Sequence, residues 1–304
     1  MQEDLVRKLT REQLNVEPIH ITVLVGGQVG HVYRVDTTDK CYVIKLVDVW
    51  EEPPFSEEPR NDRVYGSRFS NLLPAYKLLQ QNRIPVPILY ASGTLAAEKL
   101  HYVIVEYLNG DVEDYSDSWF AVIGKELGTI HRINRSYQGW VGMGTPYSEN
   151  WAEAFTKSLE SQLLQVQPFM EKGLYDLTAK YLTEITPISN PQAFVLSHTD
   201  GFQGVLKRTG DEWRLVGVVD IEDYQFTDQR FVLSGFELSH SMENRVVPES
   251  FWKAYSYVNA IDSTYDESKD LFKIYYLLVW IRVLTEQPEP QSKCLTELLK
   301  IVRE

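Results

Sequence analysis

The segments LSHTDGFQGVL (residues 196–206) and VVDIED (residues 218–223) carry the strongest indication of the fold. Asp200 follows a predicted strand and opens a loop, where a positioned carboxylate can accept a hydroxyl proton. Asp220 ends an apolar run 20 residues later, where a carboxylate can bind a hard cation such as Mg²⁺. An aspartate at a strand end is more often a turn or helix cap. Two aspartates on either side of one predicted hairpin favour a catalytic site.

A glycine turn and a lysine precede this hairpin in the sequence. The segment VLVGGQVGHVYRV (residues 23–35) places Gly26 and Gly27 between two predicted strands, where backbone N–H groups can approach a phosphate. Alone, this pattern is more typical of an ordinary hairpin. Lys45 lies in the middle of the apolar strand YVIKLV, where a charge is costly unless it has a partner. This arrangement favours binding of nucleotide phosphates over the alternative, an edge-strand lysine that faces water.

The hydrophobic pattern predicts a small β-rich lobe followed by a larger helical lobe. The first lobe is expected to hold five strands and one helix, at residues 21–25, 31–35, 41–47, about 68–82, 88–93 and 100–107. Helical spacing dominates afterwards, at residues 119–133, 151–166, 174–185, 229–242, 248–258 and 268–284. We therefore predict an α+β fold with residues 1–108 as the N-terminal lobe, a hinge at 106–110, and residues 111–304 as the C-terminal lobe.

With these elements in place, the chain resembles the aminoglycoside phosphotransferase and choline kinase family, which is related to the protein kinases. The resemblance extends over about residues 21–284 and includes IPVP (84–87), VIVEYLNG (103–110) and LGTIHRI (127–133). It implies a protein-kinase-like fold with a small antiparallel β lobe. It also implies transfer of the γ-phosphate of ATP or GTP, with Mg²⁺, to a hydroxyl or amine of a small molecule.

The family motifs imply a role for each matching residue. The family catalytic loop has the pattern His-x-Asp-x-x-x-x-Asn, so Asp200 resembles the catalytic base, and His198 is expected to hold the loop rather than act as the base. The hinge resembles the segment that hydrogen-bonds a purine through its backbone. The implied residues are, for catalysis, Asp200 and His198; for the metal, Asp220 and Gln203; for the nucleotide, Gly26, Gly27, Lys45, Glu106, Tyr107 and Leu108.

Three positions depart from the family pattern. Val205 stands where the metal-binding Asn is expected, so either Gln203 substitutes for it or the loop is one residue short. The helix segment 71–77 lacks the acid that pairs with the lysine, and the candidates to replace it are Glu57, Glu58 and Asp62. Val232 replaces an aspartate of a later helix. These departures leave open an alternative function, a non-catalytic protein that binds nucleotide or ligand as a sensor or partner.

Composition and net charge limit the classes of function that the chain can have. The chain has 304 residues and a net charge of −13, of which residues 1–108 carry −2 and the remainder −11. Nucleic acid and anionic membranes are poor partners for such a surface, because phosphate contacts need Lys and Arg. The acidic excess suits a cationic acceptor, although it also serves solubility. Two distant cysteines, no apolar leader and an interrupted apolar run at 271–284 favour a cytoplasmic protein without a membrane span.

Overall fold

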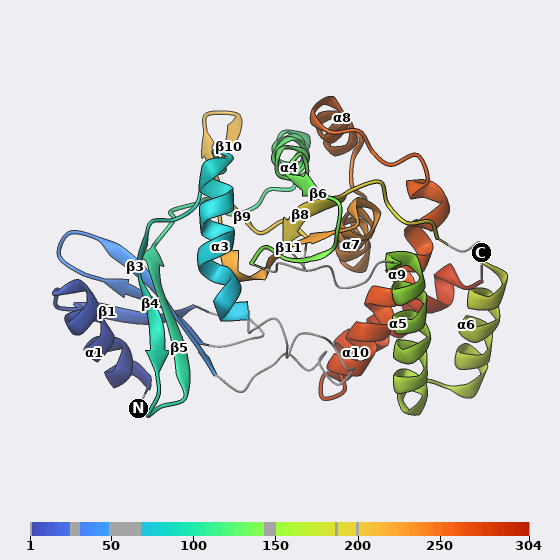
Figure 1. Cartoon of the computed structure of the whole chain (residues 1–304), viewed down its shortest axis with the longest axis horizontal. Helices are drawn as coiled ribbons and strands as arrows, with labels where there is room; N and C mark the ends of the chain where they lie inside the picture. Colours follow the sequence, from blue (N-terminus) through green and yellow to red (C-terminus); the bar gives the residue numbers. More distant parts are fainter. Residues whose placement is uncertain are drawn as a thin grey trace.

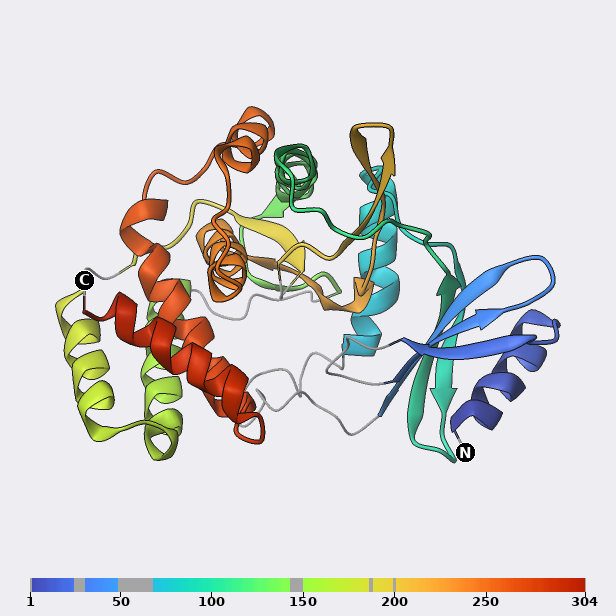
Figure 2. The same cartoon turned by 180° about the vertical axis from the view of Figure 1, so that it is seen from behind.

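Two lobes lie side by side in the computed structural model, which describes residues 2–24, 31–48, 68–142, 150–185, 188–198 and 201–303. The sheet lobe stands at one end of the molecule and the helical lobe at the other (Figures 1 and 2). Within the described ranges, no helix combines the length and apolar character needed to cross a bilayer. The predicted α+β, two-lobed fold is confirmed.

The small lobe is a five-stranded antiparallel sheet in the order β1-β2-β3-β5-β4. Side chains alternate across it, so Ile44 and Leu46 of β3 are buried on one face while Lys45 points to the other. The predicted strands are confirmed. The elements of this lobe are α1 (Gln2–Leu14), β1 (His20–Leu24), β2 (His31–Asp36), β3 (Cys41–Asp48), α3 (Arg68–Gln81), β4 (Leu89–Leu95) and β5 (Leu100–Glu106).

The expectation of one helix in this lobe was wrong, because α1 is a second helix. Val6 and Leu9 are its buried apolar residues, and they pack in one cluster with Tyr33 and Val35 of the sheet. Leu5 and Leu14 pack against this cluster while partly buried, and the other residues of α1 are charged or polar. A short helix of this kind owes its stability mainly to packing, which a local pattern underestimates.

Helix α3 lies between the sheet and the helical lobe (Figure 1). Its side chains Leu72, Tyr76 and Leu79 are buried in the core that the helical lobe builds. Pro74 lies inside the helix. Val103 of β5 belongs to the same cluster, so the packing of α3 joins the sheet to the helical lobe.

The large lobe combines helices with a hairpin and a small sheet in the order β6-β8-β11-β7. The apolar run at 271–284 forms most of α9 and is buried, as predicted. The sequence patterns missed α10 and the short strands β6, β7 and β11. The elements are α4 (Asp117–His131), β6 (Asn134–Arg135), β7 (Gly139–Trp140), α5 (Trp151–Val166), α6 (Lys172–Glu184), β8 (Phe194–His198), β9 (Gly204–Thr209), β10 (Glu212–Val218), β11 (Tyr224–Thr227), α7 (Gln229–Met242), α8 (Glu249–Val258), α9 (Tyr265–Val283) and α10 (Pro288–Ile301).

Candidate active site

Lys45 and Asp220 come from opposite lobes and meet at the boundary. The Nζ atom of Lys45 lies 2.9 Å from Oδ1 of Asp220, and it also donates a hydrogen bond to Oε1 of Glu222. The lysine side chain is only 15% exposed. Burial alone would lower the pKa of Lys45, but the charges of Glu222 and Asp220 outweigh it and raise that pKa. The lysine is therefore a fixed cation. Sequence analysis missed Glu222.

Asp220 occupies a strained turn directly after β10. Its backbone is left-handed, with φ of 51° and ψ of 49°, a conformation that Asp tolerates better than most residues. A short 3₁₀ turn, Ile221–Asp223, follows and leads into β11. The Asp220 side chain remains 44% exposed, so its carboxylate is accessible to a ligand from solvent.

The IPVP segment and the hinge hold β10, the strand that leads to Asp220. The N–H of Val218 donates to the carbonyl of Pro85 at 2.9 Å. Leu108 packs against Gly217, where an added Cβ would lie 2.8 Å from its Cδ1 atom. Residues that are distant in sequence thus fix the position of the carboxylate.

The predicted hinge residues lie at the end of β5 and just beyond it. The N–H of Glu106 donates to Ile88 O at 2.9 Å, and the N–H of Tyr107 donates to Cys41 O at 3.2 Å. Within the described part of the chain, the N–H of Leu108 has no hydrogen-bond partner. Of the three predicted hinge residues, Leu108 is therefore the one whose backbone N–H can bind a ligand.

His198 is the last residue of β8 and is buried, 2% exposed. It pairs with Tyr224 of β11, and its Nε2 atom lies 4.0 Å from Oδ2 of Asp223. Its carbonyl accepts the N–H of Gly201 at 3.2 Å, which brings together the two sides of the predicted catalytic loop. This geometry agrees with a residue that holds the loop.

Several predicted residues lie outside the described residues. They are the catalytic candidate Asp200, the glycine-turn residues Gly26 and Gly27, and the possible lysine partners Glu57, Glu58 and Asp62. Their roles stay predictions.

Gln203 precedes β9, and its carbonyl accepts the N–H of Val219 at 3.0 Å. It therefore lies beside the last residue before Asp220. Val205 is inside β9 and packs against Gly110 of the hinge. Gln203, the amide that the sequence offered as a substitute for the missing Asn, is therefore next to the Asp220 turn in backbone pairing.

The third departure from the family pattern is a packing difference. Val232 is buried in α7. Asp228, at the N-cap of the same helix, forms a buried ion pair with Arg230 at 2.6 Å. An aspartate four residues before Val232 therefore caps this helix.

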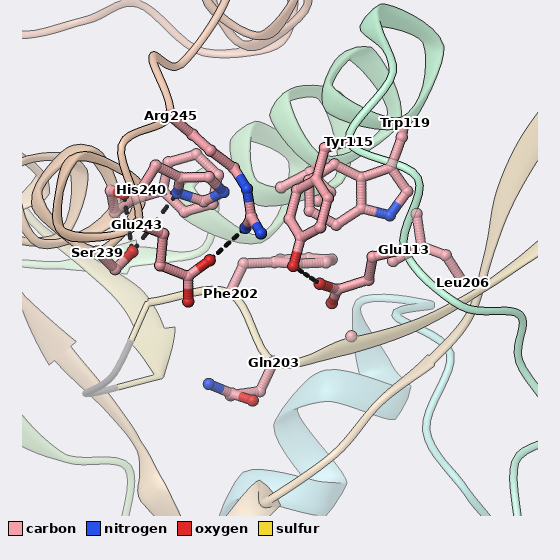
Figure 3. A pocket seen from close by; sticks show the side chains of 13 residues that line it. Glu113, Tyr115, Trp119, Phe202, Gln203, Leu206, Ser239, His240, Glu243 and Arg245 are labelled. Carbon is pink, nitrogen blue, oxygen red and sulfur yellow. Dashed lines mark hydrogen bonds and ion pairs between the residues drawn. The ribbon is translucent and has the colours of Figure 1, made fainter.

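A pocket of about 310 Å³ opens beside Gln203 on the helical lobe. The hydroxyl of Tyr115 donates to Glu113 at 2.6 Å, and the guanidinium of Arg245 lies 3.5 Å from the centre of the Tyr115 ring (Figure 3). Arg245 also pairs with Glu243. The lining residues are Glu113, Tyr115, Trp119, Ile123, Phe202, Gln203, Gly204, Leu206, Phe236, Ser239, His240, Glu243 and Arg245.

Among these lining residues, Gln203 is the one that the sequence had indicated as a site residue. The acidic segment 111–117, directly after the hinge, was the available signal for Glu113. No single sequence motif predicts the pocket, because its side chains come from separate segments that only the fold brings together.

The residues present fit a magnesium ion. Within the described ranges, no cluster of three or more His, Cys, Asp or Glu side chains forms a closed metal cage. Mg²⁺ in nucleotide sites needs only one or two carboxylates, with phosphates and water as the other ligands. The exposed carboxylate of Asp220, with Gln203 alongside, provides oxygen donors of this kind.

Comparison with known proteins assigns the family. A model of the phosphotransferase enzyme family (APH) matches residues 20–231. The chain belongs to this family. Family membership makes the protein a phosphotransferase, confirms the resemblance seen in the sequence, and does not support a non-catalytic sensor.

Individual members of the phosphotransferase family resemble this chain over nearly its full length. A probable ketoamine kinase of Pasteurella multocida is 22% identical over 279 residues, which cover 85% of this chain and 91% of the relative. A structure of a putative aminoglycoside phosphotransferase from Ralstonia eutropha has a TM-score of 0.66 at 13% identity, covering 99% and 97%. A ternary complex of aminoglycoside phosphotransferase APH(4)-Ia with AMP-PNP and hygromycin B has a TM-score of 0.60 at 14% identity, covering 98% and 97%. The structural matches confirm the kinase-like fold.

Proposed function

We propose that this phosphotransferase is a Mg²⁺-dependent small-molecule kinase that moves the γ-phosphate of ATP or GTP onto a hydroxyl, or an amine, of a small acceptor. One observation carries the proposal. Lys45 and Asp220 are 175 residues apart in sequence, yet their side chains meet at 2.9 Å between the lobes. A phosphate-binding cation and a metal-binding anion at one point are what phosphoryl transfer requires.

The sheet lobe and the hinge are proposed to bind the nucleotide. The free N–H of Leu108 is placed to hydrogen-bond a purine, while Lys45 holds the phosphates and the predicted turn at Gly26 and Gly27 covers them. The solved structure with AMP-PNP, a nucleotide analogue, has the same fold. Asp220 and Gln203 would hold Mg²⁺, which when bound neutralises charge on the phosphates.

The helical lobe is proposed to bind the acceptor next to the predicted catalytic loop. Phe202, which lines the pocket, is two residues after Asp200 in the sequence. Asp200 would orient the acceptor hydroxyl and accept its proton as the oxygen bonds to phosphorus and the nucleoside diphosphate leaves. His198 would fix the start of the loop through its buried position in β8.

The chemistry of the pocket supports a cationic, hydroxyl-bearing acceptor. Glu113 and Glu243 supply two carboxylates against one cation, Arg245, whose guanidinium already lies over the ring of Tyr115 as a cation would. Carboxylates and aromatic faces both attract an ammonium group. The names of the relatives, ketoamine kinase and aminoglycoside phosphotransferase, point to the same class of acceptor.

The proposed location is the cytoplasm. It would supply the nucleotide, and it would keep Cys41 and Cys294, which form no disulfide, in the reduced state.

A transfer assay tests the proposal. The protein is incubated with γ-labelled ATP or GTP, with and without Mg²⁺, and with fructosyl-glycine, hygromycin B, choline or 3-amino-1-propanol. We expect Mg²⁺-dependent labelling of at least one of these amine-bearing acceptors. Tyr115→Ala should raise the KM for that acceptor about tenfold and leave the KM for nucleotide unchanged. Tyr257→Ala, which truncates an exposed tyrosine on α8, is the matched control. No labelling of any acceptor, together with no nucleotide binding, would reject the proposal.

A further inference from the structure

Lys45 is a buried cation whose acid partners differ from those expected. A buried ammonium needs a fixed counter-charge, because removing it from water is costly. The family pattern would place that acid on α3, yet residues 71–77 contain none. Among the described residues, the acids paired with Lys45 are Asp220 and Glu222, both from the turn after β10.

The two acids are not equivalent. The Asp220 side chain is 44% exposed, whereas the Glu222 side chain is 12% exposed. Asp220 is the proposed metal ligand, so its charge would be shared with a cation during the reaction. Glu222 faces inward, and it is the counter-charge that stays with Lys45 throughout.

Asn71 fixes the turn that carries Glu222. It lies on α3, within the segment where the acid was expected, and is 2% exposed. Its Nδ2 atom donates to Glu222 O at 2.9 Å and to Tyr224 O at 2.8 Å, and its Oδ1 atom accepts the N–H of Gly142 at 3.1 Å. The helix thus contributes an amide that clamps the acidic turn.

The Glu222 side chain lies in largely buried surroundings. Tyr76, five residues after Asn71, has a buried hydroxyl without a hydrogen-bond partner in the described part of the chain. Burial first, and the negative charge of Glu222 second, raise the pKa of Tyr76, which places that charge near a neutral, buried phenol. Charges interact more strongly in such surroundings than in water, so the pair with Lys45 is a rigid one.

We infer that Glu222 is the positioning residue for Lys45, and that Asn71 holds it in place, so that the turn after β10 supplies both the metal ligand and the lysine's counter-charge. This inference rests on the proposed nucleotide site. Glu222 acts through Lys45 and touches no reacting atom. The sequence departure at residues 71–77 is then a relocation of the acid rather than a loss of it.

Binding of ADP and adenosine to the full-length protein, measured by calorimetry without acceptor, tests the inference. Glu222→Gln should raise the Kd for ADP about tenfold, with and without Mg²⁺, because the ammonium is no longer held toward the phosphates. The Kd for adenosine should stay unchanged, since adenosine has no phosphate. Glu222→Asp, which keeps the charge on a shorter side chain, should restore part of the ADP affinity.

A matched control separates this effect from the loss of any buried ion pair. Glu237→Gln removes the nearer of the two acids paired with Lys273. The Nζ atom of Lys273 lies 2.6 Å from Glu237 and 3.8 Å from Asp270, and this lysine is also 15% exposed. Glu237→Gln should leave both Kd values unchanged. Non-additivity gives a second readout: in a Lys45→Met background, Glu222→Gln should cause no further loss of ADP affinity.

The outcomes are distinguishable. Wild-type protein that fails to bind ADP would overturn the proposed nucleotide site, and the inference with it. Wild-type binding with an equal ADP affinity in Glu222→Gln would overturn the inference alone. Equal weakening of ADP and adenosine would assign Glu222 a general structural role, and a thermal melt of each variant shows whether it is folded.

Discussion

Val205 lies directly against Gly110, so that a Cβ placed on the glycine would be 2.5 Å from Cγ1 of the valine. The neighbouring N–H of Asp111 donates to Leu206 O at 2.9 Å, which extends this contact along the hinge. The side chain at position 205 therefore packs against the hinge, although the family pattern would make it a metal ligand.

This contact changes what Val205→Asn is expected to do. Val205 is partly buried, so an amide placed there against the hinge should lower the free energy of unfolding by about 1 kcal/mol. The Mg²⁺ concentration for half-maximal turnover should not fall. Urea denaturation and a Mg²⁺ titration at fixed nucleotide measure the two effects. A lower Mg²⁺ requirement would show that residue 205 does face the metal.

Gln203→Ala should raise the Mg²⁺ requirement. Gln203 is the amide next to the Asp220 turn, because its carbonyl accepts the N–H of Val219. Loss of one oxygen ligand that water can replace weakens the metal site without abolishing it. The same Mg²⁺ titration checks this, with Gln138→Ala as a glutamine control outside the site. An unchanged requirement would remove Gln203 from the metal set.

Asp220→Ala and Lys45→Ala should differ in their dependence on metal. Asp220→Ala should abolish the effect of Mg²⁺ on nucleotide binding, since the exposed carboxylate is the proposed ligand. Lys45→Ala should weaken binding whether or not Mg²⁺ is present, because it removes a phosphate contact. Calorimetric titration with ATP in Mg²⁺ and in EDTA makes the comparison. Identical, metal-independent behaviour of the two variants would contradict the assigned roles.

Asp200→Ala should strongly reduce phosphate transfer and leave the Kd for nucleotide nearly unchanged. The predicted base acts on the acceptor, so its loss should reduce kcat by about 10²–10⁴. Transfer of labelled phosphate and nucleotide titration are the two measurements. A variant with near-wild-type turnover would show that another group accepts the proton.

Stability should fall below pH 6.5 because of His131. Burial lowers the pKa of this histidine to about 3, and its Nδ1 atom lies 2.6 Å from the hydroxyl of Tyr255. The folded state keeps the ring neutral while the unfolded chain binds a proton, so the contribution is complete above pH 6.5 and is lost on acidification toward pH 3. The expected slope is about 1.4 kcal/mol per pH unit in this window.

Urea denaturation between pH 4 and 8 measures that slope. His131→Gln should remove most of it, even though the variant is less stable at pH 8. His20→Gln, which changes an exposed histidine at the start of β1, should retain it. A wild-type slope that does not change across pH 6.5 would show that His131 is charged in the folded protein.

The sequence by itself determined most of the order of the elements and indicated the residues of the proposed nucleotide site. Alternating residues such as Ile44 and Leu46 define β3 locally, and the lysine between them is conspicuous because a charge interrupts an apolar run. The spacing of Asp200 and Asp220 around a hairpin is likewise a local signal. The sequence pattern did not predict helix α1, because only two of its apolar side chains are fully buried and the helix needs the sheet to form.

Only the tertiary structure decided the partners. Lys45 meets Glu222 across 177 residues, and Asn71 reaches Glu222 across 151. The pocket unites Glu113, Phe202 and Arg245 from three separate segments. A local sequence pattern indicates the face of a strand or helix on which a side chain lies, because strand and helix periodicity are local properties. It does not record what that face meets, because that is set by the packing of the two lobes.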